Sequence, residues 1–169
     1  MAALCVRDHA IDRGVTVCFS GHRAERLPWR YNERDPRCTL LKRRIEEEIL
    51  LSYRLGYRFF LSGMATGFDT YAAEAVIKLA AEHPDMRLVA VYPYGAAPDA
   101  RRAKIESRAY AVVSVCESYV PSCFKKRNEF MVDNSSRIIC GFSGDMRSGT
   151  GSTLLRAVRA GLDTVTIGL

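Results

Sequence analysis

A segment rich in glycine and hydroxyl residues near the carboxyl end of the chain carries the clearest signal for ligand chemistry. It consists of Gly149, Thr150, Gly151, Ser152 and Thr153. Glycines let a backbone approach a phosphate closely, and hydroxyls and free N–H groups at a helix start donate hydrogen bonds to it. The segment is no Walker loop, because no Gly-Lys-Ser/Thr follows, and Leu154 replaces the third glycine of a dinucleotide fingerprint. It therefore predicts a phosphate-binding turn of another kind.

Further candidate ligand-binding residues follow other short apolar runs. They are Ser20, Gly21, His22, Arg23, Ser62, Gly63, Met64, Thr66, Gly67, Asp69, Tyr92, Tyr94, Arg127 and Asn128. His22 could contact a phosphate or act as an acid or base, or it could be a hydrogen-bonded turn residue. Asp69 is a candidate acid, or a first-turn residue that complements a helix dipole. Tyr92 and Tyr94 could stack on a base or belong to the core.

Six short apolar runs predict the strands that position these residues, at residues 15–20, 57–61, 87–91, 111–116, 137–142 and 164–167. Helical patterns lie between them, the first capped by Thr39. This alternation predicts an α/β fold, a single doubly wound Rossmann-like domain with a mostly parallel sheet of five to six strands. We assign residues 15–169 to this domain and expect residues 1–14 to be a flexible lead.

In an open parallel sheet, ligands bind outside the carboxyl ends of the strands, near the point where the strand order reverses. The candidate residues follow the predicted strands, so we expect them to gather along one edge. Trp29 lies in the segment after the first strand and is expected at the same edge.

Composition and charge limit the class of protein. The 169 residues are 48% hydrophobic and 26% charged, which is typical of one globular domain. No run approaches the ~18 apolar residues of a membrane helix, and no signal peptide is evident, so we expect a cytoplasmic protein that binds no membrane. The net charge of +6 is compatible with phosphate-bearing partners. The six cysteines form no C-x-x-C pair, so no metal site is predicted.

Four motifs, taken in order, resemble the YspA/YpsA-like branch of the SLOG superfamily. They are residues 17–23 (VCFSGHR), 61–69 (LSGMATGFD), Arg127-Asn128 followed by 137–141 (RIICG), and 149–153 (GTGST). The second also resembles the SGxAxGID run of the DNA-processing protein A family. The resemblance covers about residues 15–167. It implies a Rossmann-like fold that binds nucleotides or nucleotide-derived ligands, with no settled activity for this branch.

The resemblance suggests three functions. The first is a sensor or binding module for a ligand such as ADP-ribose, NAD or an AMP-like molecule, with no certain cofactor. The second is a phosphoribohydrolase-like enzyme related to the Lonely guy family, whose loop begins Pro-Gly-Gly and carries a Glu. Here Leu155 and Arg156 stand near the position of that acid, although Arg127 could match the family's arginine. The third is single-stranded DNA binding, as in DNA-processing protein A. Whether the chain cleaves a bond or forms a homo-oligomer stays open.

Overall fold

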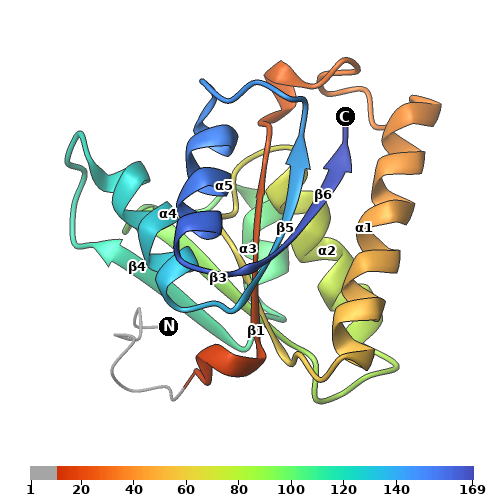
Figure 1. Ribbon diagram of the computed structural model, residues 1–169, viewed down its shortest axis with the longest axis horizontal. Helices are drawn as coiled ribbons and strands as arrows, with labels where there is room; N and C mark the ends of the chain where they lie inside the picture. Colours follow the sequence, from red (N-terminus) through yellow and green to blue (C-terminus); the bar gives the residue numbers. More distant parts are fainter. Residues whose placement is uncertain (1–10) are drawn as a thin grey trace.

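Six parallel strands form the sheet of the computed structural model, which describes residues 11–169 (Figure 1). The strands are β1 (Thr16–Gly21), β2 (Phe59–Ser62), β3 (Arg87–Tyr94), β4 (Ala111–Cys116), β5 (Arg137–Phe142) and β6 (Asp163–Gly168). Their spatial order is β4-β3-β2-β1-β5-β6, with every neighbouring pair parallel. The predicted parallel sheet is confirmed, with six strands.

Helices cover both faces of the sheet. The helices α1 (Pro36–Arg54) and α2 (Phe68–Ala80) pack together on one face, and α3 (Ala100–Glu106) packs against α2. On the other face α4 (Cys123–Asp133) lies beside α5 (Gly149–Arg159) (Figure 1). Two 3-10 turns, η2 (Arg13–Val15) and η3 (Ala24–Arg26), flank β1. The arrangement is doubly wound and Rossmann-like, as predicted.

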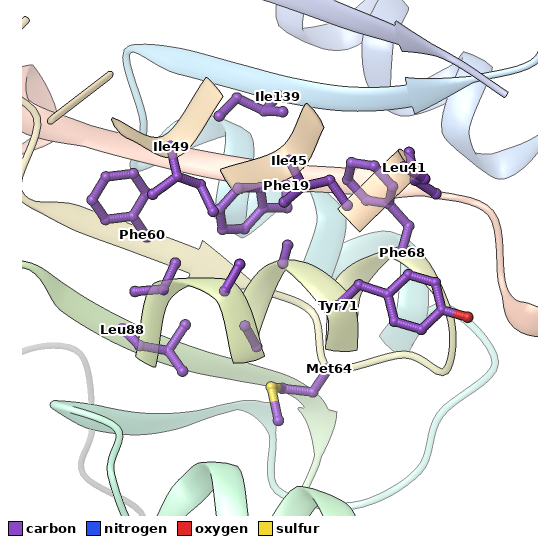
Figure 2. Packing of buried hydrophobic residues seen from close by; sticks show 14 of the residues in the cluster. Phe19, Leu41, Ile45, Ile49, Phe60, Met64, Phe68, Tyr71, Leu88 and Ile139 are labelled. Carbon is purple, nitrogen blue, oxygen red and sulfur yellow. The ribbon is translucent and has the colours of Figure 1, made fainter. Parts of the chain in front are cut away.

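Two apolar layers separate the helices from the sheet. Successive strand residues point to opposite faces, so Phe19 belongs to the layer beneath α1 and α2 while Cys18 belongs to the layer beneath α4 and α5. Figure 2 shows Ile45 and Ile49 of α1 packed near Phe19 and Phe60 in the first layer. The strands read as continuous apolar runs because both faces of the sheet are covered.

The first helix begins earlier than predicted. α1 starts at Pro36, and Asp35 caps it by accepting a hydrogen bond from the backbone N–H of Arg37 at 2.8 Å. Proline is favoured in the first helical position because its missing N–H needs no partner there. Thr39 therefore lies inside the helix and does not cap it.

The predicted lead, residues 1–14, lies mostly outside the described residues. Of its last four residues, Asp12 accepts a hydrogen bond from Gly14 N–H, and Arg13 donates from Nε to the Ser135 carbonyl at 3.2 Å. Across residues 11–169, no helix combines the length and the apolar character that crossing a membrane requires.

The strand order reverses between β1 and β5. From β1 the chain moves outward through β2 and β3 to β4, and it then returns to place β5 on the other side of β1. In such sheets a crevice opens at the carboxyl ends of the two strands that flank the reversal. A ligand site is therefore expected near the carboxyl ends of β1 and β5.

Candidate ligand-binding site

The predicted segments lie along the carboxyl edge of the sheet, because all six strands point the same way. β1 ends at Gly21 and β2 at Ser62, so the residues that follow each strand start at this edge. β3 extends to Tyr94, three residues past the predicted end at Val91, and it therefore includes Tyr92. The first turns of α4 and α5 begin at the same edge.

Arg127 of α4 is a buried cation fixed at this edge. Its side chain is 7% exposed, and Nη1 donates to the Gly63 carbonyl at 2.6 Å. Nε donates to Oδ1 of Asn128 at 3.0 Å. Within residues 11–169, no hydrogen bond engages Nη2. Burial lowers the pKa of this guanidinium, since removal from water disfavours its charge. Arg127 is thus held rigidly with one donor group uncommitted.

Asp69, in the first turn of α2, is a buried acid whose charge acts on Arg127. It is 6% exposed, and its Oδ1 has no hydrogen-bond partner among the described residues. Burial raises its pKa to about 6, against the opposing effect of the Arg127 charge. A Cβ on Gly63 would lie 2.9 Å from Asp69 Oδ2 and 3.0 Å from Arg127 Cζ. Gly63 therefore leaves room for both side chains, between which the described part of the chain shows no ion pair.

Phe124, one helical turn before Arg127, collects two guanidinium groups. Arg23 Cζ lies 5.3 Å from the centre of the Phe124 ring, and Arg127 Cζ lies 5.9 Å from it. Tyr94 meets Phe124 edge-on at 6.4 Å and Tyr119 edge-on at 5.6 Å. Arg23 is exposed and makes no ion pair in the described part of the chain. Cations beside aromatic rings also occur on surfaces that bind single-stranded nucleic acid.

Sequence reasoning did not single out Phe124. A usable signal was present, because residues three apart on a helix lie on one face, which places Phe124 beside Arg127. Tyr119 lies two residues before the proline that precedes α4 and is 60% exposed.

The start of α5 is built by its own loop. Ser148 caps the helix by accepting from Gly151 N–H at 3.0 Å, and Ser148 Oγ donates to the Asp145 carbonyl at 2.6 Å. A Cβ on Gly151 would lie 2.7 Å from that carbonyl oxygen and 2.7 Å from Met146 Cα. Gly149 has open space around it. Gly151 therefore serves packing, and Gly149 is the glycine whose backbone a ligand could approach.

An open groove of about 770 Å³ runs between α4 and α5. It brings together four predicted residues and Phe124: Asn128, Gly149, Ser152, Thr153 and Phe124. Lys125, Arg156 and Arg159 add positive charge, and Glu129 and Asp133 add negative charge. Arg156 pairs with both acids, at 3.7 Å and 3.0 Å. The groove could hold a nucleotide, since small-molecule sites commonly measure about 300–1,000 Å³.

The comparisons with known proteins agree with the order of these motifs. Residues 17–160 match the model of the YspA SLOG family. The chain belongs to the YspA SLOG family. It is 24% identical over 138 residues to a UPF0398 protein of Streptococcus mutans, which covers 78% of this chain and 79% of the relative. It is also 24% identical over 140 residues to a UPF0398 protein of Halalkalibacterium halodurans, covering 76% of this chain and 72% of the relative.

One solved structure shares the fold of this YspA SLOG chain. It is DNA processing protein A from Helicobacter pylori, described for its single-stranded DNA binding mode. The TM-score is 0.64 at 16% sequence identity, and the match covers 94% of this chain and 67% of that one. At this identity the likeness shows the fold alone.

Several predicted residues of the YspA SLOG domain have packing roles. The ring of Phe68 fills the space where a Cβ on Gly21 would lie, 2.2 Å from its Cγ. Ser62 is fully buried and donates from Oγ to the Asp69 carbonyl at 2.8 Å. Met64 is 1% exposed and takes a left-handed backbone at φ 58°. Half-buried Ser20 pairs in register with Cys140 inside the sheet.

Other predicted residues face away from the groove. Thr66 and Gly67 line a small cavity of about 60 Å³ beside α2 and α3. Thr150 is 6% exposed. Burial and the nearby Glu106 raise the pKa of Tyr92, whose hydroxyl is enclosed. Trp29 is 7% exposed and packs in the core, so its side chain is not open to a ligand.

His22 points toward β5 and not toward Arg127. Its Nε2 lies 2.7 Å from Ser143 Oγ. In residues 11–169, no three His, Cys, Asp or Glu side chains are grouped as a metal ion would require.

Proposed function

We propose that the chain is a binding module or sensor for a nucleotide-derived ligand such as ADP-ribose, NAD or an AMP-like molecule. The observation that carries the proposal is Arg127. Removing most of a guanidinium from water costs free energy, and an anionic ligand that accepts from Nη2 would offset that cost. Nearby Arg23 has no acidic partner among the described side chains and can contact the same anion.

The groove supplies the rest of such a site. Gly149 leaves its backbone open at the start of α5, where free N–H groups favour an anion. Phe124 and the exposed Tyr119 offer aromatic surface for a base. Asn128 joins the two parts, because it lines the groove and accepts from Arg127.

Single-stranded DNA binding is the second candidate. Lys125 and Lys126 are exposed next to Phe124, and Arg159 lies farther along the groove. A strand needs such cations beside stacking rings. The shared fold with a protein described for single-stranded DNA binding supports this candidate. Its affinity would fall steeply with salt, because each neutralised phosphate releases counterions.

The phosphoribohydrolase hypothesis has less support from the groove than the two binding hypotheses. Cleaving an N-glycosidic bond needs a carboxylate near the developing positive charge. Glu129 and Asp133 of the groove are both paired with Arg156, and Asp69 is buried. We therefore include product analysis in the test of binding.

Isothermal titration calorimetry with AMP, ADP-ribose, NAD and a thymidine oligonucleotide tests the proposal. We expect at least one mononucleotide or dinucleotide to bind below about 1 mM, and Arg127→Met to weaken it ~10- to 150-fold, as loss of a charge-assisted hydrogen bond implies. Arg23→Met, at an exposed residue, should also weaken the affinity for the ligand. It leaves the buried side chains of Arg127 and Asp69 unchanged. Arg43→Met removes equal charge from an exposed α1 position and should leave affinity within about twofold.

The outcomes separate the candidates. Binding of the oligonucleotide alone, with a steep salt dependence, would replace the proposal by the DNA-binding one. Chromatographic detection of released base would assign the hydrolase. No binding by any probe, or equal affinity in wild type and both site variants, would overturn the proposal.

A further inference from the structure

His22 and Ser143 form a second polar centre, at the reversal of strand order. His22 follows β1 and Ser143 follows β5, and the two strands are neighbours. His22 Nε2 and Ser143 Oγ are 2.7 Å apart, the separation of a good hydrogen bond. A histidine and a serine at this distance have the geometry of a general base and its nucleophile.

The surroundings favour the neutral form of His22. Its side chain is buried, and burial lowers its pKa from 6.5. The charge of Arg26 acts in the same direction, while Asp145 opposes it. A neutral ring with its proton on Nδ1 accepts a hydrogen bond from Ser143 Oγ–H through Nε2. Ser143 itself is exposed, so a substrate can reach its hydroxyl.

A crevice of about 200 Å³ opens over the pair. His22, Arg26, Pro28, Ser143, Asp145 and Leu169 line it. Arg26 makes no ion pair with any described residue. Gly144 follows Ser143 directly, and its N–H makes no hydrogen bond within residues 11–169. In serine hydrolases the N–H after the nucleophile stabilises the oxyanion. The crevice thus brings together a serine hydroxyl, an imidazole and a guanidinium that makes no ion pair with the described residues, and the Gly144 N–H follows that serine in the chain.

We propose that Ser143 and His22 form the nucleophile and base of an acyl-transfer site that hydrolyses a small carboxylic ester bearing a negative charge. Ser143 Oγ attacks the ester carbonyl carbon while its proton moves to His22 Nε2. The oxyanion collapses, the carbon–oxygen bond to the leaving alcohol breaks, and the alcohol takes that proton. Water then attacks the acyl-serine, and its proton passes through Nε2 to Oγ as the carboxylic acid leaves. Arg26 binds the negative charge of the substrate.

This site is separate from the proposed nucleotide site. Arg23 turns toward Phe124 of α4, whereas His22 turns toward β5. Each proposal can therefore fail without the other.

A fluorophosphonate probe tests the pair directly, because it phosphonylates activated serines with loss of fluoride. Intact and peptide mass spectrometry should locate one adduct on Ser143. His22→Gln keeps a hydrogen-bonding side chain but no base, and should slow labelling ~100-fold, a typical contribution of a general base. Ser107→Ala, at an exposed serine whose hydroxyl donates to the Lys104 carbonyl, should label like wild type.

The rate of fluorophosphonate labelling can also be measured as a function of pH on the wild-type protein, which avoids variants that could misfold. This rate should rise through a midpoint below 6.5 as His22 loses its proton. Release of p-nitrophenol from an anionic succinate monoester should exceed that from the neutral acetate, and Arg26→Gln should remove the preference. Absence of an adduct on Ser143, or equal labelling in folded His22→Gln, would overturn the proposal, and so would a pH-independent rate.

Discussion

Gly21 and Gly141 stand opposite each other in register on β1 and β5, and both lie under the ring of Phe68. Phe68 opens α2 and is fully buried, so it closes the sheet edge from one face. On the α2 side, the Phe68 ring therefore covers the ends of β1 and β5, between which the strand order reverses. His22 and Ser143 lie beyond the ends of these two strands.

Replacing either glycine with alanine should destabilise the fold. A Cβ on Gly141 would lie 2.4 Å from Phe68 Cδ2, so the ring or the strands must shift. We expect Gly141→Ala to lower the free energy of unfolding by ~1–3 kcal/mol, as overpacking does, measured by urea denaturation. Gly168→Ala on β6 is the control, since nothing lies within 4 Å of its Cβ position. Equal stability of the two variants would contradict this packing.

The two glycines at the start of α5 should respond differently to substitution. Gly151→Asp drives its side chain into the backbone of Asp145 and Met146, so we expect a lower melting temperature. Gly149→Asp meets nothing within 4 Å of its Cβ position, so it should weaken nucleotide binding at least ~10-fold by charge repulsion and leave melting unchanged. Unchanged melting of Gly151→Asp would contradict the packing assigned to it.

The Asp69 carboxyl should titrate near pH 6. The NMR chemical shift of its side-chain carboxyl carbon, Cγ, measures this titration. Because Arg127 lowers this pKa, Arg127→Met should raise it further. The folded protein holds this proton more tightly than the unfolded chain, whose reference pKa is 3.8. Stability from this group is therefore present below pH 4 and declines as pH rises to about 6, by on the order of 3 kcal/mol. Asp69→Asn should remove this decline, and an unchanged slope would contradict the assignment.

The His22 ring should titrate below pH 6.5, followed by its ring proton shifts. Arg26→Gln should raise the His22 pKa, and Asp145→Asn should lower it, because the two charges act in opposite directions. Protonation of a buried imidazole is unfavourable. The neutral His22 ring therefore makes its full contribution to stability above pH 6.5, and this contribution is lost as pH falls. A His22 pKa above 6.5 would contradict the burial seen here.

Local patterns were enough to predict the six strands and five helices, because buried parallel strands and amphipathic helices leave distinct apolar patterns. Boundaries were less accurate where another signal competed. The Asp35–Pro36 pair starts α1 before Thr39, and β3 includes Tyr92 and Tyr94 beyond the expected end. Arg127 lies at the carboxyl edge of the sheet, since its guanidinium reaches Gly63 after β2.

The division of edge residues between packing and exposure could not be predicted. That division depends on which strands become neighbours, and no local pattern shows that β5 lies beside β1. Gly21 therefore looked like a ligand contact although it accommodates Phe68. Trp29 follows β1 as expected, but its side chain packs in the core. The Ser143–His22 pair depends on the same non-local contact.

The hydrogen bond from Arg127 to Gly63 joins residues 64 positions apart in the chain. Gly63, Asp69 and Arg23 precede the exposed loop at Gly95, whereas Arg127 and Phe124 follow it. Cleavage at that loop would give two fragments, neither of which carries all the residues of the proposed nucleotide site. A ligand at that site would therefore require both halves of the chain, docked on each other, and would hold them together.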